Sequence, residues 1–246
     1  MNLFKLFDYS VPLVAAATVL GITAIITVSV ASSTAYDIKR AQDVVEVTGS
    51  AKLAVESDTA RWVINLGTMT GTNDQQAGFD RLQVATDQIT AYLEAEGLTD
   101  YETPTITSYQ EYIYPNNSQP IFTGYNVRRE IIVRSSEVEK VSSMANNMEP
   151  LSGRNYTVTT DMVELTYSKL DEVRVSLLSE AIKDATARAE AIASESSRSI
   201  GQLREASSGV VQVLPKDGIE ISDYGAYDTQ SMQKEVMVTV LATFEL

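Results

Sequence analysis

Acid–base chemistry in this chain falls to carboxylates, amines and phenols, because the sequence contains no histidine and no cysteine. Histidine is the commonest general base and metal ligand, and cysteine supplies thiolate nucleophiles and zinc–sulfur sites. Ser-His-Asp hydrolysis, disulfides and thiolate chemistry are therefore excluded. A hydrolase that uses two carboxylates is left as a weaker alternative, since no pair stands out among 33 acidic residues. We expect no enzyme activity, no catalytic residues and no cofactor.

Residues 216–235 form a polar stretch that is too long for a simple hairpin loop. Asp217, Glu220, Asp223 and Asp228 could offer oxygen ligands to Ca²⁺, but their spacing is not that of an EF-hand loop. A solvated acidic loop is the better interpretation, so we predict no metal site.

Five aromatic side chains fall close together in the sequence and form a candidate interface: Tyr109, Tyr112, Tyr114, Phe122 and Tyr125. Tyrosine adds contact area at little cost in rotamer entropy, which is why interfaces are rich in it. Three alternatives remain open for this cluster. It packs inside the domain, forms a subunit interface, or stacks on sugars as part of a solute- or glycan-binding module.

The formal net charge is −14, from 33 acidic and 19 basic residues. Nucleic-acid binding needs a basic surface that displaces counterions, so we expect no nucleic-acid partner. A phosphate-binding loop is also absent, because Gly67 and Gly71 are not followed by the Lys-Ser/Thr pair of such loops. The acidic balance suits a soluble surface that repels its neighbours.

Residues 11–31 carry no charge and predict an N-terminal transmembrane helix. The stretch is long enough to cross about 30 Å of hydrocarbon at about 1.5 Å per residue. The expected anchor side chains include Val11, Leu20, Ile25, Ile26 and Val30. A signal peptide is the alternative, because Ser29-Val30-Ala31 has the small-x-small form of a cleavage site. Flanking charges give no clear membrane orientation.

The remaining sequence alternates between strand and helix patterns. Residues 44–70 predict two strands in a hairpin, since Val45 and Val47 alternate with polar residues. Residues 73–97 predict a helix that Asn73 and Gln76 cap together. The full order, β-β-α-β-β-α-β-α-β-β, indicates an α+β fold whose mainly antiparallel sheet is covered by helices. The predicted divisions are a tail at 1–10, the anchor at 11–31, a linker at 32–43 and this domain at 44–246.

A long alanine-rich helix is predicted to begin near Leu170. Its apolar stripe recurs every three or four residues at Leu170, Val173, Leu177, Ala181, Ala185, Ala189 and Ile192. A linker would not keep this phase. The small alanines allow close packing, which we expect against the protein's own sheet. A contact with a neighbouring subunit through Ala181, Ala185 and Ala189 is the alternative.

The order of these segments resembles the SIMPL-domain family, also called DUF541, over residues 44–246. The matching pieces are Val45-Glu46-Val47-Thr48-Gly49, Ser57-Asp58-Thr59-Ala60, Gly97-Leu98, Asp100-Tyr101-Glu102-Thr103, Gly124-Tyr125, the alanine run and Ile200-Gly201. This chain departs from the family at Ser197, where glycine is common, and we expect a looser or shifted helix end there.

The resemblance implies a bacterial envelope protein, exported or anchored, with an α+β fold. Members of the family build ring- or channel-like oligomers, some are linked to stress protection, and none has agreed catalytic residues. We therefore expect a membrane-anchored homo-oligomer whose main domain lies in the periplasm or outside the cell. The alternative is a monomeric solute- or glycan-binding module in the same compartment.

Overall fold

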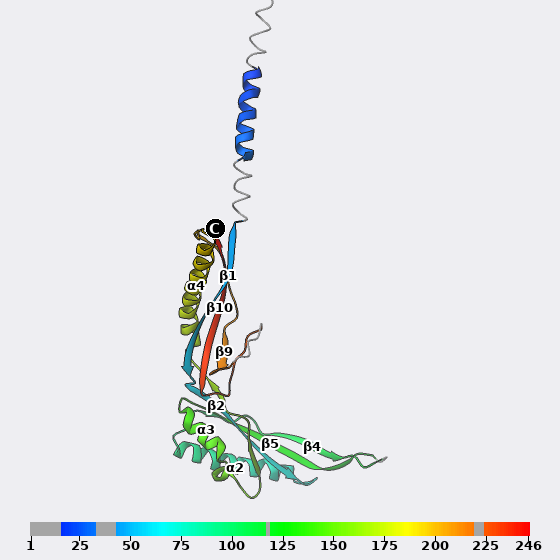
Figure 1. Cartoon of the computed structure of the whole chain (residues 1–246). Coiled ribbons are helices and arrows are strands. Elements are labelled where there is room, and N and C mark those ends of the chain that lie inside the picture. Colours follow the sequence, from blue (N-terminus) through cyan, green and yellow to red (C-terminus); the bar gives the residue numbers. More distant parts are fainter. Residues whose placement is uncertain (1–15, 33–42, 117–118, 219–223) are drawn as a thin grey trace, which may run out of the picture. The chain divides into compact units, whose positions relative to one another are not determined.

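The computed structural model describes residues 16–32, 43–116, 119–218 and 224–246 of the chain. Residues of the expected domain at 44–246 divide into two compact units. One unit consists of Ser50–Ala181 together with Gly209–Thr239. The other unit consists of Ile182–Ser208, Val240–Leu246 and the described residues before Ser50. Figure 1 shows the course of the chain. Each unit combines strands with helical segments, so the α+β prediction is confirmed.

In the described residues, the unit of Ser50–Ala181 and Gly209–Thr239 contains a six-stranded antiparallel sheet. Its path runs β3–β5–β2–β6, while β4 also pairs with β5 and β7 with β2. The strands are β2 (Thr59–Thr70), β3 (Tyr101–Glu102), β4 (Thr107–Ile113), β5 (Ile121–Ser135), β6 (Thr157–Thr160) and β7 (Glu164–Thr166). The longest pairing joins β2 and β5 from Ala60↔Ser135 to Thr70↔Tyr125. This pair forms the centre of the sheet.

Helices α2 (Gln75–Ala95) and α3 (Val138–Asn146) pack against this sheet (Figure 1). Alternate residues of β2, namely Trp62, Ile64 and Leu66, are buried in the same core as Leu82 and Ile89 of α2. The period of two in the strand and of three to four in the helix produces these matching faces. A short 3₁₀ helix, Glu149–Leu151, follows α3. The opposite face of β2 and β5 is left without a covering helix in the described ranges.

A second sheet has the order β1–β10–β8, with β9 also pairing β10. Its strands are β1 (Val44–Glu56), β8 (Leu203–Ser208), β9 (Gln212–Pro215) and β10 (Gln233–Glu245). Alternate residues of β10 are buried, namely Val236, Val238, Val240, Ala242 and Phe244. Helix α4 (Leu170–Glu195) runs beside this sheet in Figure 1.

Two local predictions are wrong. The segments at 44–56 and 59–70 do not form a hairpin, because β1 pairs with β10 and β2 pairs with β5. Alternation reveals a strand's buried face but not its partner. The capping box at Asn73 is also absent, since α2 begins at Gln75 after Asp74 and no side chain caps it. Gln76 instead donates to Asp80 Oδ1, 3.0 Å away on the helix surface.

The predicted alanine-rich helix is confirmed as α4, which begins at Leu170. Ala181, Ala185 and Ala189 are completely buried within the single chain. The stripe then continues at Ala193, which is 1% exposed, whereas Ile192 is 49% exposed. The buried residues of α4 therefore recur every four residues up to Ala193. Ile192, which the sequence pattern placed in the stripe, is not among them.

Within the described residues, no transmembrane helix of the kind expected over residues 11–31 is found. A helix, α1, covers residues 16–32, and residues 11–15 with Val11 lie outside the described part of the chain. No helix in the described ranges combines the length and apolar character needed to cross a membrane. Its side chains at Leu20, Ile25, Ile26 and Val30 are nevertheless exposed.

Candidate functional site

The four carboxylates of the acidic loop were candidate Ca²⁺ ligands, and only two of them lie in the described part of the chain. No group of three or more acidic side chains there is placed to hold a metal ion. Glu220 and Asp223 lie outside the described residues, and Asp217 has a left-handed backbone with φ of 62°. The fourth carboxylate, Asp228, is held by a lysine. This contact indicates a structural role for the described part of the loop.

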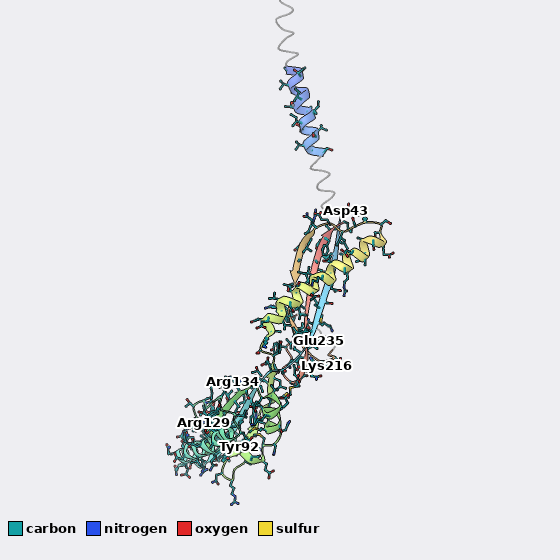
Figure 2. The ribbon with its side chains drawn as sticks, turned by 90° about the vertical axis from the view of Figure 1, so that its left-hand side faces the viewer. Asp43, Tyr92, Arg129, Arg134, Lys216 and Glu235 are labelled. Atoms are coloured by element: carbon teal, nitrogen blue, oxygen red, sulfur yellow. The ribbon has the colours of Figure 1, made fainter. Side chains whose placement is uncertain are left out.

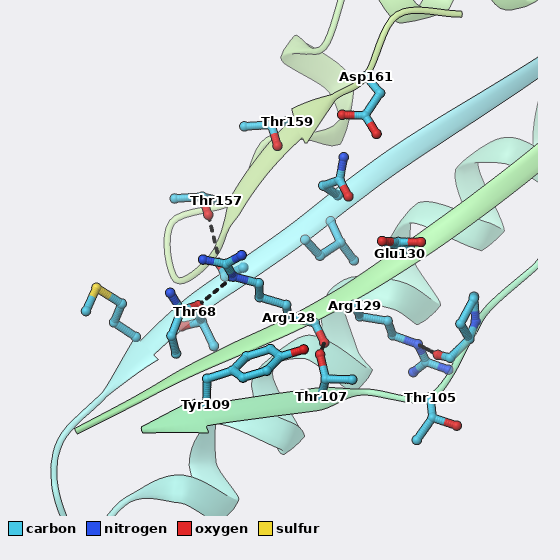
Figure 3. Close-up of a pocket in the computed structure, with 16 residues that line it drawn as sticks. Thr68, Thr105, Thr107, Tyr109, Arg128, Arg129, Glu130, Thr157, Thr159 and Asp161 are labelled. Carbon is cyan, nitrogen blue, oxygen red and sulfur yellow. Dashed lines mark hydrogen bonds between the residues drawn. The ribbon is translucent and has the colours of Figure 1, made fainter. Parts of the chain in front are cut away.

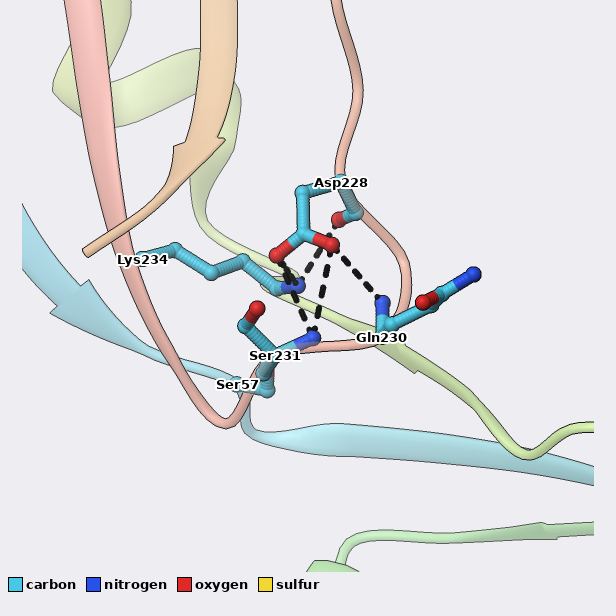
Figure 4. A network of polar contacts seen from close by, with 5 residues as sticks. All are labelled: Ser57, Asp228, Gln230, Ser231 and Lys234. Atoms are coloured by element: carbon cyan, nitrogen blue, oxygen red, sulfur yellow. Dashed lines mark hydrogen bonds and ion pairs between the residues drawn. The ribbon is translucent and has the colours of Figure 1, made fainter. Parts of the chain in front are cut away.

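Lys234 and Asp228 form a buried ion pair near the start of β10 (Figure 4). The Lys234 side chain is 0% exposed, and its Nζ lies 3.0 Å from Asp228 Oδ2. The same Nζ donates to the Asp228 carbonyl oxygen at 2.7 Å. Backbone N–H groups of Gln230 and Ser231 donate to the carboxylate, and Ser57 Oγ donates to the Ser231 carbonyl oxygen. These contacts hold the end of the loop against the start of β10 and the turn at Ser57.

The hydrogen bonds around Asp228 favour its ionised form. Burial by itself raises the pKa of Asp228, but the backbone N–H of Gln230 and the Lys234 and Ser231 donors outweigh it and leave the pKa below its usual 3.8. Asp228 is thus held as a carboxylate at neutral pH. A carboxylate with a lowered pKa does not suit the role of a general acid.

Asp58, the central residue of the Ser57-Asp58-Thr59-Ala60 motif, is a second structural carboxylate. Its two oxygens accept hydrogen bonds from Ser168 N–H and Ser168 Oγ, each at 2.8 Å. Its own N–H donates to the Thr166 carbonyl oxygen at 3.0 Å. Asp58 therefore fixes the turn that leads into α4.

A polar groove lies on the face of β2 and β5 that no described helix covers (Figure 3). It has a volume of about 860 Å³. One row of the sheet crosses it, since Thr107 of β4 faces Arg128 of β5, Arg128 faces Gly67 of β2, and Gly67 faces Thr157 of β6. The other lining residues are Asn65, Leu66, Thr68, Met69, Pro104, Thr105, Tyr109, Asn126, Arg129, Glu130, Thr159 and Asp161. We call this the polar groove.

Gly67 makes the polar groove hollow at its middle. A glycine inside a central strand weakens the strand and often marks a place where another molecule approaches the backbone. A Cβ at this position would lie 3.1 Å from Thr157 Oγ1 and 4.0 Å from the Val127 carbonyl oxygen. Any larger side chain would stand in the groove, so its depth depends on this glycine.

One end of the polar groove is tied down by Arg129. The guanidinium donates to the carbonyl oxygens of Pro104 and Thr103 at 3.1 and 3.4 Å, and to Gln83 Oε1 at 2.9 Å. Figure 2 shows Arg129 and Arg134 on this unit. Arg134 instead pairs with Glu102 at 2.8 Å and does not line the groove. Arg129 is thus a positioning residue, whereas Arg128 is available to a ligand.

A second candidate surface is the distal end of the β4–β5 hairpin. The pairing of β2 with β5 stops at Tyr125, so residues 121–124 of β5 pair with β4 alone in the described structure. Gly124, with φ of 146°, stands at this junction. We call residues 112–113 of β4 and 121–123 of β5 the distal arm.

The structure separates the five aromatic residues that the sequence grouped. Tyr109 lines the polar groove and is 58% exposed. Phe122 packs on Tyr112 and Tyr125, with ring centroids 5.5 and 5.2 Å apart. Tyr114 is 75% exposed just beyond the distal arm. The cluster therefore divides between a groove wall and an arm.

The alanine stripe, which was the alternative candidate for a subunit contact, has no exposed surface. Ala181, Ala185 and Ala189 are each 0% exposed in the isolated chain. Sequence reasoning also missed the groove residues Arg128 and Thr157. Their only sequence signal is the glycine at position 67 inside a strand pattern, and it does not reveal which strands lie alongside.

The model of the SIMPL family, described as a protein of unknown function (DUF541), matches residues 45–244. The match covers β1 through the greater part of β10 and hence both sheets. A search of curated proteins finds no match to the chain.

Proposed function

Because the chain belongs to the SIMPL (DUF541) family, we propose that it is a non-enzymatic, membrane-anchored protein of the cell envelope that assembles with copies of itself. The observation that carries the assembly is the distal arm, whose apolar side chains face solvent. Ile113 and Ile121 are cross-strand partners and are 53% and 51% exposed. Tyr112 beside them is 40% exposed.

The distal arm lacks the support that a stable ribbon needs. A two-stranded hairpin is marginal in water, and a third strand or a packed surface normally stabilises it. Within the described residues, β4 pairs only with β5, which leaves its other edge open. The sequence Thr107–Ile113 contains neither lysine nor proline, the residues that commonly block edge pairing.

A second copy of the chain is the occupant that fits this edge. Two identical strands pair antiparallel about a twofold axis, so one surface serves both subunits. The same axis brings the exposed isoleucine pair of one arm toward that of its partner. Glu111 is the only charged residue of β4, so little charge opposes the approach.

The test is the mass of the full-length chain in detergent, measured by light scattering with the detergent subtracted. The chain weighs 26.9 kDa, and we expect the wild-type mass to be a multiple of this value. Ile113→Lys places a charge in the arm and is expected to lower the mass to that of one chain. Val84→Lys is the matched control, because Val84 is 56% exposed on α2, away from the arm. A wild-type monomer, or an Ile113→Lys oligomer of unchanged mass, overturns the assembly.

The anchoring part of the proposal rests on α1. Its large apolar side chains, among them Leu20 and Ile25 at 69% and 71% exposed, have no cover in the described structure. A membrane supplies such cover, with the folded domain outside the cytoplasm. Alkaline extraction of membranes should leave the full chain in the pellet and release a chain without residues 1–31. A C-terminal reporter that is active only in the cytoplasm overturns the orientation.

A further inference from the structure

We propose that the polar groove of the β4–β5–β2–β6 face binds a neutral carbohydrate. The groove's volume of about 860 Å³ falls in the range of small-molecule sites, about 300–1,000 Å³. The inference does not rest on self-association, because its residues lie on the sheet and not on the distal arm.

The lining offers hydrogen-bond donors and acceptors side by side. In the described residues, Arg128 uses only its Nε within the chain, donating to Asn126 Oδ1 at 3.1 Å, which leaves its terminal nitrogens for a ligand. Thr157 and Thr107 donate to the carbonyl oxygens of Gly67 and Arg128, so their hydroxyl oxygens keep lone pairs that can accept. A sugar hydroxyl both donates and accepts, and a lining of mixed groups suits it.

The charges favour a neutral ligand over an ion. Arg128 and Glu130 alternate along the exposed side of β5, and Asp161 adds a second carboxylate to the lining. A phosphate or a carboxylate ligand would meet these acids, while a metal ion or a polyamine would meet Arg128. A polyhydroxylated ligand avoids both repulsions and uses all three groups as hydrogen-bond partners.

Carbohydrate sites also need an apolar wall, which Tyr109 provides. The C–H face of a sugar ring is apolar and stacks on an aromatic ring, while the ring hydroxyls point sideways to polar groups. Tyr109 neighbours Asn126 in the pairing of β4 with β5, next to the row that contains Arg128. Gly67 opens the floor beneath, so a ring can approach the backbone of β2.

Ligand-observed saturation-transfer NMR on the full-length chain in detergent tests this assignment. The probes are three neutral trisaccharides, namely cellotriose, maltotriose and triacetylchitotriose, with inorganic phosphate and spermidine as charged comparators. We expect transfer from the protein to at least one trisaccharide, strongest at the ring C–H protons. Arg128→Ala and Gly67→Val should each weaken the affinity about tenfold or more, as the loss of a charged hydrogen bond or of space does.

Arg134→Ala is the matched control, because Arg134 is on the same strand but pairs with Glu102 outside the groove. It should bind like the wild type. The melting temperature of each variant separates lost binding from lost folding, and Arg128→Ala changes an exposed side chain. The proposal is overturned by no transfer to any trisaccharide at about 10 mM, a concentration that detects millimolar affinity. Binding that survives in Arg128→Ala, or a preference for phosphate or spermidine, overturns it as well.

Discussion

Ser197 ends α4 in the same backbone conformation in which Gly97 ends α2. Their φ angles are 53° and 82°, both in the left-handed region. The N–H of the following residue bonds back in the same way, from Arg198 to the Ala193 carbonyl and from Leu98 to the Leu93 carbonyl, at 2.9 and 2.8 Å. Both ends are Schellman motifs, and one uses serine at the position that glycine favours.

Ser197→Gly should therefore stabilise the protein. A side chain in the left-handed region is strained by about 1–2 kcal/mol, and the greater flexibility of glycine when unfolded offsets part of the gain. We expect the free energy of unfolding in denaturant to rise by about 0.5–1 kcal/mol. Ser196→Gly is the control, since Ser196 has no positive φ, and should not stabilise. A loss of stability in Ser197→Gly would show that serine is preferred there.

Gly124 cannot be replaced without distorting the sheet. Its φ is 146°, and a Cβ would lie 1.9 Å from the Thr70 carbonyl oxygen, a backbone atom that cannot swing away. We expect Gly124→Ala to lower the free energy of unfolding by about 3 kcal/mol or more. Gly71→Ala has its nearest neighbour at 3.8 Å and should melt close to the wild type. Equal melting temperatures for the two variants would contradict this account.

Lys234→Met should be strongly destabilising because it leaves the Asp228 carboxylate without its buried partner. Breaking one side of a buried ion pair costs about 3–5 kcal/mol. Lys52→Met is the control, since Lys52 pairs with Glu235 at 2.6 Å but is 51% exposed, and an exposed pair contributes less than about 1 kcal/mol. Chemical unfolding compares the two. A similar loss in both variants would argue that burial of Lys234 does not matter.

The Asp228 carboxylate also makes the free energy of unfolding depend on pH. Burial raises the pKa of Asp228, but its donors outweigh this effect and hold the pKa below 3.8 in the folded protein. A lowered pKa adds stability above the unfolded value, and that stability is lost as the pH falls through the folded value. The difference in unfolding free energy between wild type and Asp228→Asn should therefore shrink from about pH 6 to about pH 2. A difference that stays constant would mean that the carboxylate charge is not involved.

Ala185 tests the packing of α4. It is 0% exposed, and Ala185→Leu should lower the free energy of unfolding by about 1–3 kcal/mol through overpacking. Ala187→Leu is the control on the exposed side of the same helix and should stay within about 0.5 kcal/mol of the wild type. If Ala185→Leu melts like the control, α4 does not pack closely at this point.

Several features followed from the sequence because they depend on local pattern. The period of α4 and the α+β class were readable from spacing and element order, and the family was identified by resemblance to its motifs. The predicted element order lacked three short strands, since segments as short as β3 carry too little pattern to stand out. The apolar stretch at 11–31 was also evident, yet no membrane-crossing helix was found in the described residues.

Strand partners and surfaces were decided only by the tertiary structure. The alternating pattern of residues 44–70 predicted two strands, but not that β5 and β6 flank β2 in place of β1. The polar groove exists because that pairing sets Thr107, Arg128, Gly67 and Thr157 in one row, although they are far apart in the sequence. Likewise, the sequence predicted a solvated loop for the segment that contains Lys234 and Asp228. In the folded protein these two side chains form a buried ion pair. Local periodicity determines elements and faces, whereas sites arise from long-range pairings that no local pattern encodes.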